Sequence, residues 1–272
     1  MACNVLCNWL KKSDVSFDVA YAPPFDGGVD WRETTPAQYS YIFFVCGPFG
    51  NGWPVTDFLD HFSGIKLIGL NLTLLQSLEE WNPFALCYER DSNSLHRPDI
   101  TFASTSKKIP VVGIILAHKQ KEYGVRSKHP IVDKVITDFI GSKQVVRVNI
   151  DTCIENNEGG LKTAEQVESL IAKMDMVITT RLHGVALSIK NGVPVIAIDA
   201  VEGGAKVSLQ AKSIHWPLLF STAVSNEDIE KAFAYCLTNE AKILALKCAD
   251  EARKKTDELG EELMEKIREI DN

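Results

Sequence analysis

Residues 174–207 read MDMVITTRLHGVALSIKNGVPVIAIDAVEGGAKV and join two apolar runs through a helical stretch. Residues 176–179 are typical of a buried strand, and residues 184–190 of a short helix that ends at Asn191-Gly192. Residues 193–198 then read as a second apolar strand. Strand, helix and strand in this order predict a compact βαβ unit, in which the two strands are parallel.

The same alternation of β-branched apolar runs and helical periodicities extends along most of the chain, which is typical of an α/β fold. Further strands are predicted at residues 17–22, 41–45, 66–70, 110–116 and 145–149. Helices are predicted from the apolar faces Val5/Leu6/Trp9/Leu10 and Ile131/Val135/Ile136/Phe139, and at residues 163–173 and 240–272. The last of these carries Leu246, Ala249, Ala252, Leu259, Leu263 and Ile267 near one face. We interpret its many Lys and Glu residues as a solvated surface, with an interaction helix as the alternative.

A polar stretch that ends in Pro110 separates two halves of the chain. Because a fresh apolar strand follows it, we predict two Rossmann-like domains at residues 1–106 and 107–272, with parallel sheets flanked by helices. The first half begins with a helical pattern, whereas a doubly wound domain normally begins with a strand. We therefore expect the first domain to lack its first strand.

Composition excludes several classes of protein. With 272 residues, 45% of them hydrophobic and 24% charged, the chain has the profile of a folded protein. Its seven cysteines are scattered without a C-x-x-C pair, which argues against a disulfide framework and a structural zinc site. A net charge of -7 disfavours sequence-independent binding to nucleic acid. No apolar run is long enough to span a bilayer, and the first residues do not resemble a signal peptide, so we expect a cytoplasmic protein.

Arg181, Leu182 and His183 lie where the strand at 176–179 meets the following helix. Ligands gather at this edge of a parallel sheet, where the helix presents free N–H groups and the positive end of its dipole. The arginine offers a planar fork for a carboxylate or phosphate, and the histidine can exchange a proton near neutral pH. Together they indicate an anionic substrate, although the same side chains can also cap carbonyls or pair with a core carboxylate.

The next predicted strand ends at Asp199 and leads into Gly203, Gly204 and Lys206. The glycines allow close approach of the backbone to a ligand, and the lysine adds a second cation at the start of another helix. If the two strands are neighbours, both loops open at the same sheet edge. Two such loops in succession favour a ligand site. His118 and His129, on polar loops, are interpreted as ordinary surface residues.

The segment from Thr180-Arg-Leu-His-Gly184 to Asp199 resembles the polysaccharide pyruvyl transferase family, which carries Arg-Leu-His-Gly at a strand-to-helix turn followed by a Gly-Val-Pro strand ending in Ile-Asp. A weaker resemblance covers about residues 40–215. It rests on Cys46-Gly-Pro-Phe-Gly50 as a glycine-rich turn, on Glu89-Arg-Asp-Ser92, and on Pro98-Asp99-Ile-Thr-Phe102.

The resemblance implies a fold like that of the B-type glycosyltransferases and transfer of pyruvate from phosphoenolpyruvate to a sugar as a ketal. Arg181 and Lys206 would then hold the donor, and His183 would act as general acid or would orient and protonate the donor phosphate. The first domain would face the acceptor sugar or polysaccharide precursor, and neither a cofactor nor a metal is implied. The family often has an arginine at the end of the first strand of the second domain, and here Lys119 or Arg126 would take its place as a second anion contact. The other expected substrate contacts are Leu182, Gly184, Asp199, Gly203, Gly204 and Gly47.

Two alternatives remain open at the level of sequence. A nucleotide-sugar glycosyltransferase of the same two-domain fold would use Arg181 and Lys206 on a diphosphate. A non-catalytic glycan-binding or assembly protein would keep the fold without the reaction. The sequence leaves the acceptor sugar and the oligomeric state undetermined.

Overall fold

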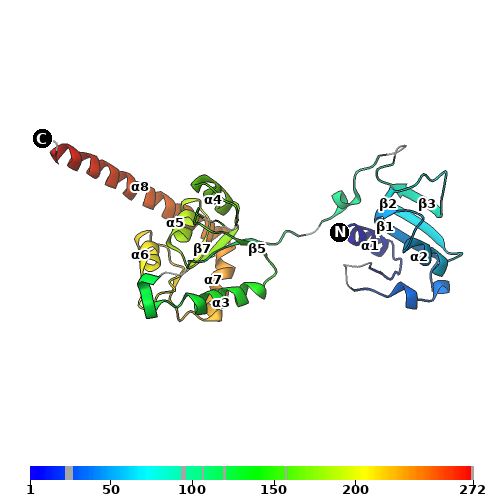
Figure 1. Ribbon diagram of the computed structural model, residues 1–272, viewed down its shortest axis with the longest axis horizontal. Helices are drawn as coiled ribbons and strands as arrows, with labels where there is room; N and C mark the ends of the chain where they lie inside the picture. The colour runs from blue at the N-terminus through cyan, green and yellow to red at the C-terminus, as the bar shows by residue number, and fades with distance from the viewer. Residues whose placement is uncertain are drawn as a thin grey trace. The chain divides into compact units, whose positions relative to one another are not determined.

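The computed structural model describes residues 1–21, 27–92, 96–105, 107–118, 121–155, 157 and 159–270. The chain forms two compact units, Met1–Lys107 and Lys108–Asn272. Each contains a parallel β-sheet flanked by helices (Figure 1). The predicted α/β class with two parallel sheets is therefore confirmed.

The first unit contains a three-stranded sheet of β1 (Tyr41–Phe49), β2 (Lys66–Leu74) and β3 (Phe84–Glu89), in the order β1-β2-β3. Helix α1 (Ala2–Lys12) packs Ala2 and Val5 against Ile100 and the sheet, whereas α2 (Val55–His61) contributes to a second, aromatic-rich core. Three single-turn helices complete the described part of the unit: η1 (Trp31–Glu33), η2 (Pro36–Gln38) and η3 (Ile100–Ala103).

The second unit contains β4 (Val111–Ile115), β5 (Val146–Asn149), β6 (Met176–Thr179), β7 (Val195–Ile198) and β8 (Leu219–Phe220). All neighbouring strands are parallel, in the order β5-β4-β6-β7-β8. The chain passes from β4 to β5 on one side and then returns to place β6 on the other side of β4. The strand order therefore reverses between β4 and β6, and in open α/β sheets such a switch point is where ligands bind.

Helices cover both faces of this five-stranded sheet. On one face α4 (Ala164–Ile171), α5 (Leu182–Lys190), α6 (Lys206–Ser213) and the first part of α8 (Asn239–Ile270) bury small and branched side chains in a common core. On the other face α3 (His129–Gly141) and α7 (Asn226–Cys236) do the same. Because β6 and β7 are buried along their whole length, they read as continuous apolar runs, as expected for a sheet covered on both faces.

Several predictions about individual elements need correction. The predicted strand at residues 17–22 is wrong: among its described residues only Ala20 forms a bridge, an isolated antiparallel one with Gly28. In α3 the predicted apolar face is shifted, because Ile131 is 62% exposed while Val132 is buried. Strands β3 and β8, and the single turns of η4 (Lys121–Arg126), were not predicted.

The long C-terminal helix α8 is buried only in its first part, at Ala241, Ala245, Cys248 and Ala249. Its second part extends beyond the helices that cover the sheet of the second unit (Figure 1). Leu259, Leu263 and Ile267, which were expected on one face, are exposed there. None of the helices in the described part of the chain is long and apolar enough to cross a membrane.

Candidate functional site

Three polar side chains follow three adjacent strands at the carboxyl edge of the second sheet. His118 follows β4, Asp151 follows β5 and Arg181 follows β6. Since these strands are parallel and β4 lies between the other two, their ends place the three residues at one edge. The arrangement coincides with the topological switch point between β4 and β6.

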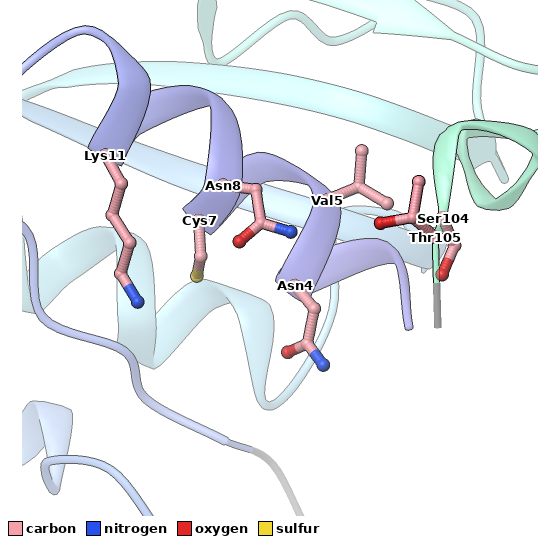
Figure 2. A pocket seen from close by; sticks show the side chains of 7 residues that line it. All are labelled: Asn4, Val5, Cys7, Asn8, Lys11, Ser104 and Thr105. Atoms are coloured by element: carbon pink, nitrogen blue, oxygen red, sulfur yellow. The ribbon is translucent and has the colours of Figure 1, made fainter. Parts of the chain in front are cut away.

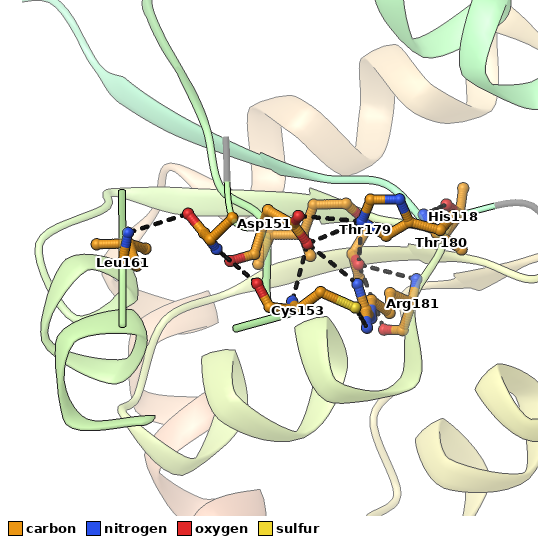
Figure 3. Close-up of polar contacts among 10 residues, drawn as sticks. His118, Asp151, Cys153, Leu161, Thr179, Thr180 and Arg181 are labelled. Atoms are coloured by element: carbon orange, nitrogen blue, oxygen red, sulfur yellow. Dashed lines mark hydrogen bonds and ion pairs between the residues drawn. The ribbon is translucent and has the colours of Figure 1, made fainter. Parts of the chain in front are cut away.

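Asp151 is the centre of this cluster. Its carboxylate accepts from Nη1 of Arg181 at 3.3 Å and lies 3.0 Å from Nε2 of His118. Nη2 of Arg181 in turn lies 3.0 Å from Sγ of Cys153 (Figure 3). The side chains of Arg181 and Asp151 are largely buried, whereas that of His118 is 60% exposed. The guanidinium of Arg181 is thus held between a carboxylate and a thiol beside a solvent-accessible imidazole.

Local hydrogen bonds shape the loop that carries Asp151 and Cys153. The amide of Cys153 donates to Oδ1 of Asp151 at 2.8 Å. The side-chain amide of Asn157 donates to the carbonyls of Asp151 and Cys153 at 2.9 and 2.7 Å, and its own oxygen accepts from the amide of Leu161. These bonds fix the loop by backbone and side-chain contacts before any ligand arrives (Figure 3).

Two threonines fix the turn that carries Arg181. The hydroxyl of Thr179 donates to the carbonyl of Ile115 at 2.7 Å and accepts from the amide of Arg181 at 3.0 Å. The hydroxyl of Thr180 accepts from the amide of Ala117 at 2.9 Å. Two of these three bonds, to Ile115 and from Ala117, cross from the β6 side to the β4 side, so the Thr-Thr pair ties the Arg181 turn to the loop that carries His118.

The charge state of Asp151 follows from these contacts. Burial opposes ionisation of its carboxyl, but the Cys153 amide and the neighbouring His118 and Arg181 favour the charged form more strongly. The pKa of Asp151 therefore lies below its usual value. At neutral pH the cluster contains a carboxylate that can hold a cation or orient the imidazole of His118.

Helix α5 begins directly after Arg181, whose side chain makes no capping hydrogen bond to the N-terminus of the helix. The side chain of His183 is exposed in the first turn and makes no hydrogen bond or ion pair to a side chain or loop of the described residues, and Leu182 is partly buried. Gly184 is buried against β6: a Cβ there would lie 2.1 Å from Oγ1 of Thr179. This glycine thus permits the close packing of helix and strand, while His183 stays available to a ligand.

The second predicted loop, after β7, is held by a buried carboxylate of its own. Asp199 is buried and accepts from the amides of Ala205 and Ser208 at 2.7 and 2.8 Å, so its carboxylate caps α6. Gly203 and Gly204 both have positive φ values, of 81° and 78°, which glycine adopts without strain. Lys206 pairs with Glu122 at 3.8 Å at the start of α6.

The structure therefore divides the predicted residues between two loops. Arg181 and His183 belong to the loop and helix after β6, and Asp199 and Lys206 to those after β7. Among the described residues, no hydrogen bond or ion pair joins Arg181 to Asp199 or Lys206. Two further candidates lie elsewhere: Gly47 is within β1 of the first unit with φ of 91°, and Lys119 lies outside the described residues.

His129 begins α3 and, contrary to the expectation of a surface residue, is 5% exposed. Its Nδ1 lies 2.9 Å from the hydroxyl of Ser127. Burial lowers the pKa of this histidine, the carboxylate of Asp199 opposes that change, and Lys206 adds to it. His129 is therefore a buried neighbour of the β7 loop.

Sequence reasoning missed Asp151 and Cys153 and placed His118 on ordinary surface, whereas the structure places it in the polar cluster. A usable signal was present. Asp151 follows the predicted strand at 145–149 in the same way that Arg181 follows its own strand. Applying the strand-end rule to every predicted strand of the second half would have selected both Asp151 and His118.

The first unit has a separate concave region of about 300 Å³ beside α1. Figure 2 shows the residues that line it: Asn4, Val5, Cys7, Asn8, Lys11, Ser104 and Thr105. Sγ of Cys7 lies 3.9 Å from Sγ of Cys3 on the same helix, and burial together with this neighbour raises the pKa of Cys7. No sequence motif with a chemical role falls in this pocket.

Comparison with known proteins adds one finding. A search against curated proteins finds no match to the chain. A family model described as polysaccharide pyruvyl transferase, however, matches residues 75–200 and so confirms the resemblance first seen in the Arg-Leu-His-Gly turn. The segment of this chain that contains His118, Asp151 and the Arg181–Gly184 turn is therefore similar in sequence to the polysaccharide pyruvyl transferase family.

Proposed function

We propose that this protein transfers the pyruvyl group of phosphoenolpyruvate to two hydroxyl groups of a sugar, forming a ketal in the synthesis of a surface polysaccharide or exopolysaccharide. The observation that carries the proposal is the family match over residues 75–200, which includes an arginine at the sheet's switch point. A fold like that of the B-type glycosyltransferases and a location in the cytoplasm, where phosphoenolpyruvate is made, belong to the same proposal.

The reaction sets the demands on the site. The methylene carbon of phosphoenolpyruvate gains a proton and becomes a methyl group, and two sugar hydroxyls form C–O bonds to the adjacent carbon. The bond from that carbon to the phosphate oxygen breaks, and inorganic phosphate leaves. Of the two hydroxyl protons, one balances the new methyl group and the other leaves with the phosphate. The site must hold a trianionic donor and move protons.

Arg181 is the proposed contact for the donor anion. Its guanidinium lies at the carboxyl edge of the sheet beside the N-terminus of α5, and both features favour a phosphate or carboxylate. Asp151 and Cys153 hold the guanidinium in place. The donor then meets an arginine whose position is already defined, which reduces the entropy lost on binding.

His183 and His118 are the proposed proton-transfer groups. His183 is exposed in the first turn of α5, next to the proposed anion contact, and is suited to protonate the methylene carbon or the phosphate. His118 is held by the Asp151 carboxylate, as a general base is commonly oriented by a third group. We assign it to accept a proton from an attacking sugar hydroxyl.

The β7 loop supplies the remaining proposed contacts. Gly203 and Gly204 allow the backbone to approach a ligand closely, and Lys206 brings a second positive charge to the start of α6. Asp199 holds this loop in shape and does not contact the substrate itself, since its carboxylate already accepts from the amides of Ala205 and Ser208. Acceptor binding by the first unit, including Gly47, is part of the proposal, and no cofactor is required.

The test is to incubate the full chain with phosphoenolpyruvate and a panel of glycan acceptors. Phosphate release is followed together with the mass of the glycan. Acceptor-dependent phosphate release with addition of one pyruvyl group per acceptor is the expected result. Transfer from a nucleotide sugar without any use of phosphoenolpyruvate would instead support a glycosyltransferase and contradict the proposal.

A further inference from the structure

We infer that His118, Asp151 and Cys153 form a binding site for a divalent metal ion of the zinc type. Nε2 of His118, a carboxylate oxygen of Asp151 and Sγ of Cys153 all lie within 4.8 Å of one another. The inference does not rest on pyruvyl transfer, because ion binding by three side chains can be measured without phosphoenolpyruvate. It does involve the groups that hold Arg181 and His118, so a bound ion would exclude the arrangement proposed for donor binding.

The donor set itself selects the class of ion. One imidazole nitrogen, one carboxylate oxygen and one thiolate sulfur are the three ligand types that zinc takes in proteins. A soft thiolate disfavours magnesium and calcium, which prefer oxygen ligands throughout. Three protein ligands also leave one position of a tetrahedral ion open for water or for an oxygen of a substrate, as in catalytic zinc sites.

The distances match this coordination after small movements. Zinc–ligand bonds of about 2.0 to 2.3 Å place neighbouring donors of a tetrahedral ion about 3.3 to 3.6 Å apart. Nε2 of His118 already lies 3.0 Å from both carboxylate oxygens of Asp151. No two of the three donor atoms lie more than 4.8 Å apart, so movement of about 1 Å brings them to the spacing of a tetrahedral ion.

The loop that supplies two of the three donors is held in shape by other groups. Asn157 binds the backbone carbonyls of both Asp151 and Cys153, and the Cys153 amide binds the Asp151 carboxylate. Such outer contacts orient metal ligands and strengthen binding. His118 comes from a different strand and is 60% exposed, so an ion can reach the site from solvent.

The same atoms already hold a cation, the guanidinium of Arg181. It takes up one oxygen of Asp151 and the sulfur of Cys153. A bound zinc ion replaces both contacts: the Cys153 thiol loses its proton to solvent as the sulfur–zinc bond forms, and Arg181 turns away. Metal binding thus competes with the Arg181 contacts, and removal of the arginine is expected to raise metal affinity.

Cobalt(II) is the probe of choice, because a cobalt–thiolate bond gives a charge-transfer absorption band in the near ultraviolet. We expect the full-length chain to bind one Co²⁺ with this band, and Zn²⁺ to displace it. Cys153→Ser should abolish the band, and His118→Ala should weaken binding by at least about tenfold. Arg181→Ala should keep the band and bind Co²⁺ more tightly than the parent.

Matched controls separate this site from the other thiols and imidazoles. The Cys3→Ser/Cys7→Ser double variant removes the pair of thiols that lie 3.9 Å apart on α1, and His96→Ala removes an exposed histidine of the first unit. Both should bind Co²⁺ like the parent. Circular dichroism of each variant establishes that it is folded, and the Arg181→Ala titration tests the site with all three ligands intact.

Absence of the band in the parent chain at millimolar Co²⁺, or its persistence in Cys153→Ser, would overturn the inference. Weaker binding in Arg181→Ala would also overturn it, because the arginine would then support the ion instead of competing with it. Phosphate release from phosphoenolpyruvate is measured separately. Failure of metal binding is therefore distinguishable from failure of the proposed function.

Discussion

Nη2 of Arg181 lies 3.0 Å from Sγ of Cys153, although 28 residues separate them in the chain. The contact exists because β5 and β6 both end at the edge where the order of the second sheet reverses. The carboxylate of Asp151, from the same loop as Cys153, accepts a second hydrogen bond from Nη1 of Arg181. The arginine of the Arg-Leu-His-Gly turn is therefore fixed by the loop after β5, and its geometry as well as its charge is defined before a ligand binds.

Arg181→Lys tests whether that geometry matters. A lysine keeps the positive charge but cannot bridge Asp151 and Cys153 with two nitrogens or grip an anion with a planar fork. We expect phosphate release from phosphoenolpyruvate to fall about 30- to 100-fold, the equivalent of about 2 to 3 kcal/mol. The matched control is Arg147→Lys, an exposed arginine of β5, which should leave the rate unchanged. Equal rates for the two variants would remove Arg181 from the proposed site.

His183→Gln tests proton transfer. Glutamine retains polarity and similar size but cannot supply a proton near neutral pH, so kcat should fall by about 10²- to 10⁴-fold with a small change in KM. Because His183 is exposed, the free energy of unfolding should stay within about 0.5 kcal/mol of the parent's value. Steady-state kinetics on His183→Gln and on the control His96→Gln measure kcat and KM, and urea unfolding of both variants measures the free energy of unfolding. A change in KM alone would assign His183 to binding and not to proton transfer.

Gly184→Ala tests the structural role of the last residue of the motif. A Cβ at this position would lie 2.1 Å from Oγ1 and 2.8 Å from Cβ of Thr179, so α5 must move away from β6. Overpacking of this kind costs about 1 to 3 kcal/mol in the free energy of unfolding. Gly260, within the exposed part of α8, has open space around its Cα. There the change to Ala should stabilise the helix by up to about 1 kcal/mol.

Urea unfolding of the two glycine variants gives the comparison. The midpoint should fall for Gly184→Ala and should rise or stay constant for Gly260→Ala. If Gly184→Ala keeps the parent's stability and loses only activity, the glycine serves a ligand and not the helix–strand contact.

Asp133 provides a pH-dependent prediction. Burial raises the pKa of its carboxyl to about 6, and its Oδ1 has no hydrogen-bond partner among the described residues. In the unfolded chain the pKa returns to about 3.9, so the folded chain binds more protons between about pH 4 and 6. The free energy of unfolding should therefore fall as pH rises through this window. Asp133→Asn should remove this decrease, because asparagine does not ionise.

At pH 7 we expect Asp133→Asn to be more stable than the parent by about 2 kcal/mol, and at pH 4 to be about equal. The full pKa difference corresponds to about 3 kcal/mol, which is reduced because solvent screens this half-buried carboxyl. Asp138→Asn on the same helix is the control, because Asp138 is exposed and pairs with Lys134. Removing that surface pair should change stability by less than about 1 kcal/mol at any pH. A parallel pH dependence in the parent and Asp133→Asn would show that another group is responsible.

The limits of sequence reasoning follow from burial. Met176–Thr179 was predicted with its correct bounds because β6 is covered on both faces and all four of its residues are apolar or bonded internally. Strand β3, FALCYE, was missed because a short apolar run without alternation does not by itself distinguish a strand from a helix, and none of its residues is buried. Strand β8 has only two residues and gives no periodic signal. The false strand at 17–22 has β-branched and aromatic residues but no neighbouring strand to pair with among the described residues.

The sequence predicted only the part of the candidate site that lies after β6. The Arg181 turn was found because its motif lies within a single βαβ unit and needs no long-range contact. Its partners Asp151 and Cys153 come from a loop whose place depends on the sheet order β5-β4-β6, and the sequence does not state that order. The role of Asp199 shows the converse. It stands at a strand end, but its carboxylate is used by the amides of its own loop.

The central proposal is that Arg181 holds the anionic groups of phosphoenolpyruvate, and calorimetric titration tests it without knowledge of the acceptor. We predict that the parent chain and His96→Ala bind phosphoenolpyruvate with a dissociation constant below the millimolar range. Arg181→Ala, folded by circular dichroism, should bind at least about tenfold more weakly. A parent chain that does not bind phosphoenolpyruvate at millimolar concentration, or an Arg181→Ala variant that binds it as tightly as the parent, would contradict the proposal.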